Sequence, residues 1–242
     1  DFYGDVDMSV LSAARSSIAD RISCYENDCS ESFTTHVIAV NDDGAFSVFT
    51  ADVDADGDMD VLSALHEADT IAWYENDGSQ NFTERVVSTA AYGAESVFAL
   101  DMDGDGDMDI LASFYHINKV VWFENDGSAD PTFTVGGEIE TEQGRPQSIF
   151  AADMDGDGDM DILIGSANPI DSGNSDKISW HENDGNVDPT WTASDIDMDE
   201  ERDIRDLIAE DMDGDGDMDI VAALTSITPL PCMRMMVMQI LL

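Results

Sequence analysis

The sequence predicts an all-β fold built from repeated four-stranded units, and three observations support this prediction. An acidic nine-residue segment recurs with starts at positions 1, 52, 101, 153 and 211, which are separated by 51, 49, 52 and 58 residues. Short apolar segments flank each acidic segment, and a repeated Glu-Asn-Asp turn segment follows. A period near 50 residues is typical of propellers and solenoids. Four short antiparallel strands per period describe a β-propeller blade, so we expect about four to five blades in the chain.

The first two strands of each unit enclose the acidic segment. Residues rich in Val, Ile, Phe and Ala lead into the segment and leave it, as expected for short buried strands. The predicted first strands are residues 47–51, 96–100, 148–152 and 207–210. The predicted second strands are residues 61–65, 110–113, 162–165 and 220–223.

The third strand of each unit runs into a turn. Three copies carry Trp, an aromatic residue and Glu-Asn-Asp-Gly, and the first copy has Cys24 and Cys29 in place of Trp and Gly. These segments are residues 22–29, 71–78, 120–127 and 178–185. Asn-Asp-Gly favours a hairpin turn because these residues tolerate positive φ. An alternating fourth strand, such as residues 82–87, closes the unit, and no stretch has helical periodicity.

The acidic segments indicate bound cations. The run Asp-Met-Asp-Gly-Asp-Gly-Asp-Met-Asp occurs three times, and residues 52–60 differ from it at two positions. At about 5 Å and an effective dielectric near 20, each pair of like charges costs roughly 3 kcal/mol, so an empty compact loop is strongly disfavoured. Oxygen ligands at alternate positions, with glycine at the bends, suit Ca²⁺. The alternative is a solvated acidic turn without metal.

An EF-hand does not fit these segments. It requires a bidentate Glu at position twelve and a helix on either side. Position twelve holds Ser63, Ala112, Ile164 and Ala222 in the four complete copies.

The composition limits the class of partner. The 242 residues carry 54 acidic and 9 basic side chains, a formal net charge of −45. Nucleic acid and anionic membrane surfaces are poor partners for such a field, and no apolar run approaches a membrane span. Hydrophobic residues make up 43% of the chain, enough for a packed core. A salt-adapted surface is an alternative, but 23 of the acids lie inside the five repeated segments instead of being spread evenly.

These motifs resemble the FG-GAP/VCBS repeat family, whose best-known members are the integrin α-chain propellers. The resemblance covers residues 1–228 and rests on the Asp-x-Asp-x-Asp-Gly-x-x-Asp loop between apolar strands, with the Trp-aromatic-Glu-Asn-Asp-Gly hairpin. Gly44-Ala45 and Gly93-Ala94 before the first strand agree with it. The resemblance implies a calcium-binding β-propeller of four-stranded antiparallel blades. Because relatives usually close with seven blades, and because the chain opens inside a repeat without a visible signal peptide, we expect a fragment of a longer parent chain with further repeats.

The resemblance also implies a ligand set for about four structural Ca²⁺ ions. Side chains at positions one, three, five and nine and the carbonyl at position seven would bind each ion. The side chains are Asp52, Asp54, Asp56 and Asp60; Asp101, Asp103, Asp105 and Asp109; Asp153, Asp155, Asp157 and Asp161; and Asp211, Asp213, Asp215 and Asp219. The carbonyls are those of Asp58, Asp107, Asp159 and Asp217. The first copy keeps only Asp1, Asp5 and Asp7, with Tyr3 and Ser9 at ligand positions, so we expect it to be weak or empty.

The remaining candidate groups do not predict catalysis. Trp73, Trp122 and Trp180 hold one fixed place in each unit, which favours packing between blades over sugar stacking. His36, His66, His116 and His181 have no paired nucleophile in view, so an enzyme is not expected and no catalytic residue is assigned. A disulfide between Cys24 and Cys29 is an alternative to two free thiols.

The tail, residues 229–242, matches no blade strand. Reading its codons out of frame restores an acidic loop, which suggests a gene-model artefact over a further repeat, and the alternative is a short apolar C-terminal strand. Resequencing the transcript distinguishes the two.

Together these features predict a non-catalytic, calcium-binding, extracellular or cell-surface module for adhesion or ligand recognition. Its partner would be a protein or a carbohydrate, bound by loops on one face, with residues 168–176 and 195–206 the first places to look because they break the repeat. The alternatives are an accessory domain of a secreted, polysaccharide-active enzyme and a calcium-stabilised spacer without ligand.

Overall fold

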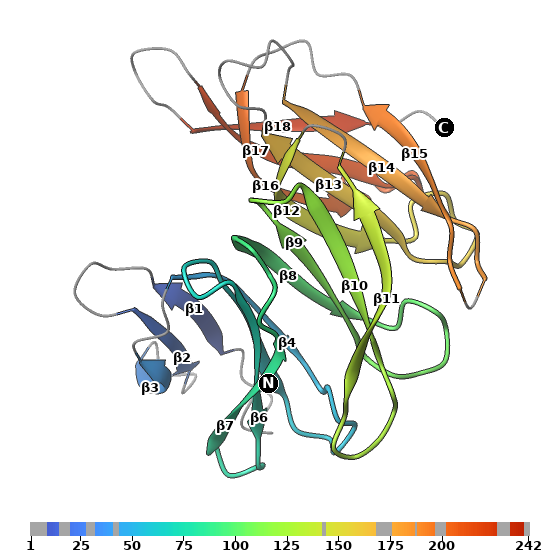
Figure 1. Cartoon of the computed structure of the whole chain (residues 1–242). Helices are drawn as coiled ribbons and strands as arrows, with labels where there is room; N and C mark the ends of the chain where they lie inside the picture. Colours follow the sequence, from blue (N-terminus) through green and yellow to red (C-terminus); the bar gives the residue numbers. More distant parts are fainter. Residues whose placement is uncertain are drawn as a thin grey trace. The chain divides into compact units, whose positions relative to one another are not determined.

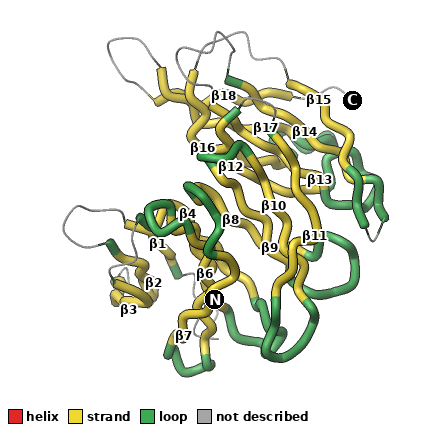
Figure 2. The backbone as a smooth tube through the Cα atoms, viewed as in Figure 1, coloured by secondary structure: helices red, strands yellow, loops and turns green. Residues whose placement is uncertain are grey.

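All of the regular secondary structure in the described part of the chain is β-strand (Figures 1 and 2). The computed structural model describes residues 9–14, 20–27, 32–40, 44–141, 144–167, 176–186, 188–196, 202–226 and 233–239. The strands form five sheets of three or four strands. The prediction of an all-β fold of antiparallel propeller blades is confirmed. The described residues contain no helix with the length and hydropathy needed to cross a membrane.

Each sheet consists of strands that follow one another in sequence. The first contains β1 (Val10–Ala14), β2 (Arg21–Asn27) and β3 (Phe33–Val40). The second contains β4 (Ala45–Ala51), β5 (Asp60–Leu65), β6 (Thr70–Asn76) and β7 (Phe82–Ser88). The third contains β8 (Ala94–Leu100), β9 (Asp109–Phe114), β10 (Lys119–Asn125) and β11 (Phe133–Glu140). The fourth contains β12 (Arg145–Ala152), β13 (Asp161–Ala167), β14 (Lys177–Asn183) and β15 (Trp191–Ile196), and the fifth β16 (Arg202–Glu210), β17 (Asp219–Ser226) and β18 (Met233–Gln239).

The repeated motifs occupy the same place in successive sheets. In the second, third and fourth sheets the acidic loop joins the first and second strands and the Asn-Asp-Gly turn joins the third and fourth, and the acidic loop has the same place in the fifth sheet. Residues of neighbouring strands align antiparallel, as in the row Leu62–Trp73–Arg85 across β5, β6 and β7. The first acidic segment, with Asp1, Asp5 and Asp7, lies outside the described residues.

The last sheet extends into the predicted non-repeat tail. β18 pairs antiparallel with β17 over seven residues, from Thr225↔Met233 to Asp219↔Gln239. It therefore takes the position of a third strand, as the short C-terminal strand weighed in the sequence analysis would. The proposal that residues 229–242 are out of frame concerns the gene and stays a prediction for resequencing.

The second strands of the three four-stranded sheets lie deepest in the described core. Every residue of β5, β9 and β13 is buried. A strand covered on both faces needs apolar side chains at consecutive positions instead of alternate ones. This explains why the segments after the acidic loops read as unbroken apolar runs.

The chain divides into two compact units. One consists of residues 1–100, 106–112 and 122–135, and the other of residues 101–105, 113–121 and 136–242. Within each unit, first strands of successive blades contact each other, β4 with β8 and β12 with β16. In each of these two strand contacts, a serine hydroxyl of one blade accepts a backbone N–H of the next blade. Ser47 accepts from Val97 at 3.4 Å, and Ser148 accepts from Leu207 at 3.2 Å.

Candidate metal centres

The acidic loops bring carboxylates together. In each of the three described loops that lie wholly within one unit, the side chains at positions one, three and five place oxygen atoms within 4.8 Å of one another. These are Asp52, Asp54 and Asp56; Asp153, Asp155 and Asp157; and Asp211, Asp213 and Asp215. Sequence analysis predicted all nine as ligands, and the fold gathers them through local chain geometry alone.

Left-handed backbone at positions four and six winds the loops tightly. Gly156 and Gly158 have φ of 79° and 101°, and Gly214 and Gly216 repeat these values closely. In the loop of residues 52–60, Ala55 takes position four at φ 59°. Glycine adopts such angles without a Cβ penalty, whereas an L-residue pays roughly 1–2 kcal/mol.

Backbone N–H groups fix the carboxylate at position one. In the loop of residues 153–161, Asp153 accepts from Gly156 at 2.7 Å and from Gly158 at 3.1 Å. Asp211 accepts in the same way from Gly214 and Gly216. The loop thus holds its carboxylates in place by its own amides, which preorganises oxygen atoms for a cation.

The loop of residues 101–109 contributes to both units, and each part repeats these local contacts. Asp101 accepts the N–H of Gly104 at 2.8 Å, and Asp103 accepts that of Asp105 at 3.1 Å. Asp109 accepts the N–H of Asn125 at 2.8 Å.

The aspartate at position nine is buried and linked to the hairpin. Asp60 is fully buried, and it accepts the backbone N–H of Val53 at 3.1 Å and of Asn76 at 2.8 Å. Asp161 accepts the corresponding backbone N–H groups of Met154 and Asn183, and Asp109 and Asp219 are also buried.

Burial raises the pKa of Asp60 to about 6, and the hydrogen bonds from Asn76 and Val53 oppose the rise. The indole N–H of Trp73 lies nearby and also lowers the pKa of Asp60, although the two groups do not form a hydrogen bond of normal geometry. Position nine therefore has a structural role that sequence analysis did not assign to it.

The hairpin asparagine completes this connection, and sequence analysis missed it as a supporting residue. Asn76 donates from Nδ2 to the carbonyl of Met59 at 3.1 Å and accepts the N–H of Gly78 at Oδ1 at 3.2 Å. Asn125 and Asn183 make the same two contacts. Asn125 also donates to the carbonyl of Val53, 72 residues away, at 3.0 Å. The recurrence of this asparagine in four repeats, at positions 27, 76, 125 and 183, was the available signal.

Comparison with known families agrees with this geometry. The FG-GAP-like repeat model matches residues 52–112 and 111–164, a stretch that includes the acidic loops of residues 52–60, 101–109 and 153–161. Residues 52–164 therefore match FG-GAP-like repeats. No curated protein matches the chain in sequence.

A solved structure shares the fold of this chain. A protein from Lactobacillus plantarum superposes with a TM-score of 0.60 and 13% identity, over 96% of this chain and 68% of its own. A putative 6-phosphogluconolactonase from Bacteroides uniformis gives a TM-score of 0.45 and 11% identity, over 96% of this chain and 82% of its own. At such identities the first likeness shows the fold alone.

The tryptophans of the repeated hairpin segments are packed in the blades, as predicted. Trp73 and Trp122 are 1% and 4% exposed, and Trp180 is partly buried. The Trp73 ring meets the Phe133 ring of the next blade edge-on, with centroids 6.3 Å apart.

The histidines and cysteines lie in separate surroundings. His36 contacts Glu26 at 2.9 Å and His66 contacts Glu95 at 3.6 Å. His116 packs edge-on to Tyr115. Cys24 is buried, whereas Cys29 lies outside the described residues, so the disulfide alternative stays a prediction.

Replacing the hairpin glycine should destabilise a repeat. A Cβ at Gly185 (φ 66°) would overlap the side chain of Asp159, whereas a Cβ at Gly156 (φ 79°) meets nothing within 4 Å. We expect Gly185→Ala to lose about 0.5–1 kcal/mol more unfolding free energy than the control Gly156→Ala, because the backbone strain is alike and only Gly185→Ala forces the Asp159 carboxylate to move. Urea unfolding of both variants in chelator measures the difference, and equal losses would contradict it.

Acid should weaken the fold through His181. This side chain is buried and lies 3.0 Å from the Ser179 hydroxyl, and burial, followed by the charge of Lys177, lowers its pKa to about 4. The unfolded state binds the proton first, so this stabilisation is complete above pH 6.5 and is lost as pH falls toward 4. From pH 7 to pH 5 the loss should be about 2 kcal/mol. His181→Phe, which places the Phe of another repeat here, should lose about 2 kcal/mol less than the parent in the same interval, and equal losses in urea unfolding would contradict the assignment.

Proposed function

We propose that the chain is a non-catalytic, calcium-binding recognition module in which one Ca²⁺ ion stabilises each complete acidic loop. The observation that carries the proposal is the gathering of three aspartate oxygens within 4.8 Å in the loops. Those oxygens are held by the backbone of the loop itself, so they converge without help from a partner.

The donor set fits Ca²⁺. All donors are oxygen atoms, as a hard cation requires. Because Ca²⁺–oxygen distances are about 2.3–2.6 Å, two ligands of one ion lie no more than about 5 Å apart, which the carboxylate groups satisfy. Asp52, Asp54 and Asp56 with their repeats would supply the side chains, and the buried aspartates at position nine would link each ion site to the hairpin.

Repulsion between the carboxylates supports a bound cation. The pKa of Asp54 is raised, first by burial and then by the nearby charges of Asp56, Glu75 and Asp52, against a backbone hydrogen bond. A divalent ion placed among these oxygens reverses that unfavourable field. The ion's role here is to stiffen the turn between the first two strands.

We infer the location from the usual affinity of extracellular calcium modules, and the class of partner from the net charge of the chain. Extracellular calcium modules commonly bind at about 10⁻⁴–10⁻³ M, so the sites would fill outside the cell. The net charge of −45 disfavours nucleic acid and anionic surfaces, which leaves a protein or carbohydrate ligand for an adhesion or recognition role.

Native mass spectrometry and calorimetry of the full chain test the metal part. We expect about four Ca²⁺ ions per chain, and weaker binding of Mg²⁺, which demands shorter distances and octahedral geometry. Triple variants of one loop, such as Asp52, Asp54 and Asp56 to Asn, should remove one ion and leave the others. Absence of bound Ca²⁺ at millimolar concentration would overturn the proposal.

A further inference from the structure

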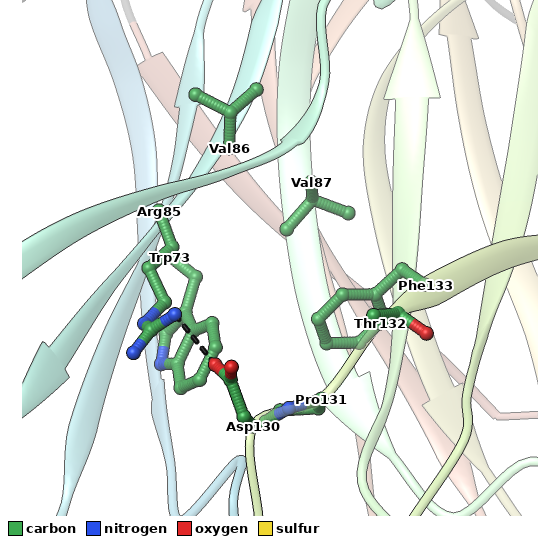
Figure 3. Close-up of a pocket in the computed structure, with 8 residues that line it drawn as sticks. All are labelled: Trp73, Arg85, Val86, Val87, Asp130, Pro131, Thr132 and Phe133. Carbon is green, nitrogen blue, oxygen red and sulfur yellow. Dashed lines mark hydrogen bonds and ion pairs between the residues drawn. The ribbon is translucent and has the colours of Figure 1, made fainter. Parts of the chain in front are cut away.

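A pocket of about 390 Å³ lies between two blades of one unit, and none of its lining residues belongs to an acidic loop (Figure 3). Its walls come from β6 and β7 on one side and from the loop before β11 on the other. The lining residues are Trp73, Arg85, Val86, Val87, Asp130, Pro131, Thr132 and Phe133. We call it the Arg85 pocket. Its volume falls in the range of small-molecule sites.

The Arg85 pocket departs from the repeat. Arg85 pairs across the strands with Trp73, and the same register position holds His36 in the first sheet and Ser194 in the fourth. The structural parts of the repeats, in contrast, keep their residues from blade to blade. Of the three sheets whose register is given at this position, one has a long cation there, which points to a role other than packing.

Arg85 is fixed in the pocket by two carboxylates from different blades. Its Nε donates to Glu75 at 2.5 Å and its Nη1 donates to Asp130 at 2.6 Å, 45 residues away. Its guanidinium lies 5.4 Å from the centre of the Trp73 ring. The Arg85 side chain is 39% exposed and that of Asp130 is 78% exposed, so both polar groups remain accessible from solvent. Figure 3 shows this pair on one side and Phe133 facing it.

Apolar side chains from both sides complete the lining of the pocket. Val87 of β7 and Phe133 at the start of β11 are partly buried, Pro131 is buried, and the Thr132 hydroxyl donates to Asp126. The pocket therefore presents one accessible acceptor, one fixed guanidinium and several apolar side chains. This combination suits a ligand with hydroxyl groups on one side and C–H groups on the other.

Charge excludes the other ligand classes. An anion would meet the field of a chain with net charge −45 and an arginine already paired with two carboxylates. A cation would lie beside the Arg85 guanidinium. An apolar ligand would leave the polar pair desolvated without new hydrogen bonds. We infer that the Arg85 pocket binds an uncharged saccharide ring, with its hydroxyls on Asp130 and Arg85 and its C–H face on Phe133 and Val87. The inference rests on the proposed recognition role and names its ligand class, but it uses none of the metal ligands.

The test is binding of the full calcium-loaded chain to an array of neutral, sialylated and sulfated glycans, followed by saturation-transfer NMR with methyl glycosides of glucose, galactose and mannose. We expect binding to neutral glycans only. Asp130→Ala and Arg85→Ser should each weaken it at least tenfold. Asp188→Ala, in the matching Asp-Pro-Thr turn before β15, is the control and should leave binding unchanged.

Asp130 is exposed, so its replacement should leave the thermal melt unchanged even if Arg85→Ser disturbs folding. Any one of three results would overturn the inference. The first is no binding of neutral glycans, and the second is a preference for acidic glycans or for a polylysine peptide. The third is neutral-glycan binding that survives Asp130→Ala. The number of bound ions is counted on the same samples. A chain that binds Ca²⁺ but no neutral glycan refutes the pocket alone, and a chain that binds glycan but no Ca²⁺ refutes the metal sites alone.

Discussion

Calcium at ten times its dissociation constant should stabilise the chain by about 6 kcal/mol. One site at that saturation contributes about 1.4 kcal/mol to the free energy of unfolding, and four independent sites add to about 6 kcal/mol. For a chain of this size the midpoint of thermal unfolding should rise by about 12–24 °C. The reason is that the ion binds the gathered carboxylates of the folded loops and not the dispersed ones of the unfolded chain.

Circular dichroism melts in calcium and in excess chelator measure this effect. Sodium chloride at equal ionic strength is the control for general screening of the −45 charge. If sodium chloride raised the midpoint as much as calcium does, the loops would act as solvated acidic turns, and the assignment of metal ligands would have to be withdrawn.

The second large effect should separate the two roles of the loop aspartates. Asp60→Ala leaves the buried N–H groups of Val53 and Asn76 without an acceptor. At about 1–3 kcal/mol per orphaned donor, we expect a loss of about 2–6 kcal/mol in unfolding free energy. This loss should be present in chelator as well as in calcium, because the hydrogen bonds do not depend on the ion.

Asp56→Ala is the matched comparison in the same loop. Asp56 is exposed, and its described hydrogen bond is to the N–H of Asp58 within the loop. In chelator the variant should be as stable as the parent within about 0.5 kcal/mol, since surface substitutions have small effects. In calcium it should lose the contribution of one site, about 1.4 kcal/mol. Urea unfolding of both variants, in calcium and in chelator, gives the four unfolding free energies to compare with the parent. If the loss caused by Asp60→Ala disappeared in chelator, position nine would be only a ligand.

Much of the fold could be predicted from the sequence because its signals are local. The acidic loop, the flanking apolar runs and the Asn-Asp-Gly turn each determine a few residues of backbone, and their period of about 50 residues is visible without any structure. Strands such as β5 and β13 accordingly begin and end within a residue or two of the predicted segments. The gathering of Asp52, Asp54 and Asp56 follows from turns inside nine residues, so it too was predictable.

Only the tertiary structure decided which distant groups meet. Asn125 and Val53 are 72 residues apart, and Arg85 and Asp130 are 45 apart, and both contacts depend on how one blade packs on the next. The same holds for the aspartates at position nine, whose burial gives them a structural role that the sequence pattern does not distinguish from that of a ligand. Turns are fixed by the conformational preferences of adjacent residues, whereas these contacts are fixed by burial and packing between strands that no local pattern encodes.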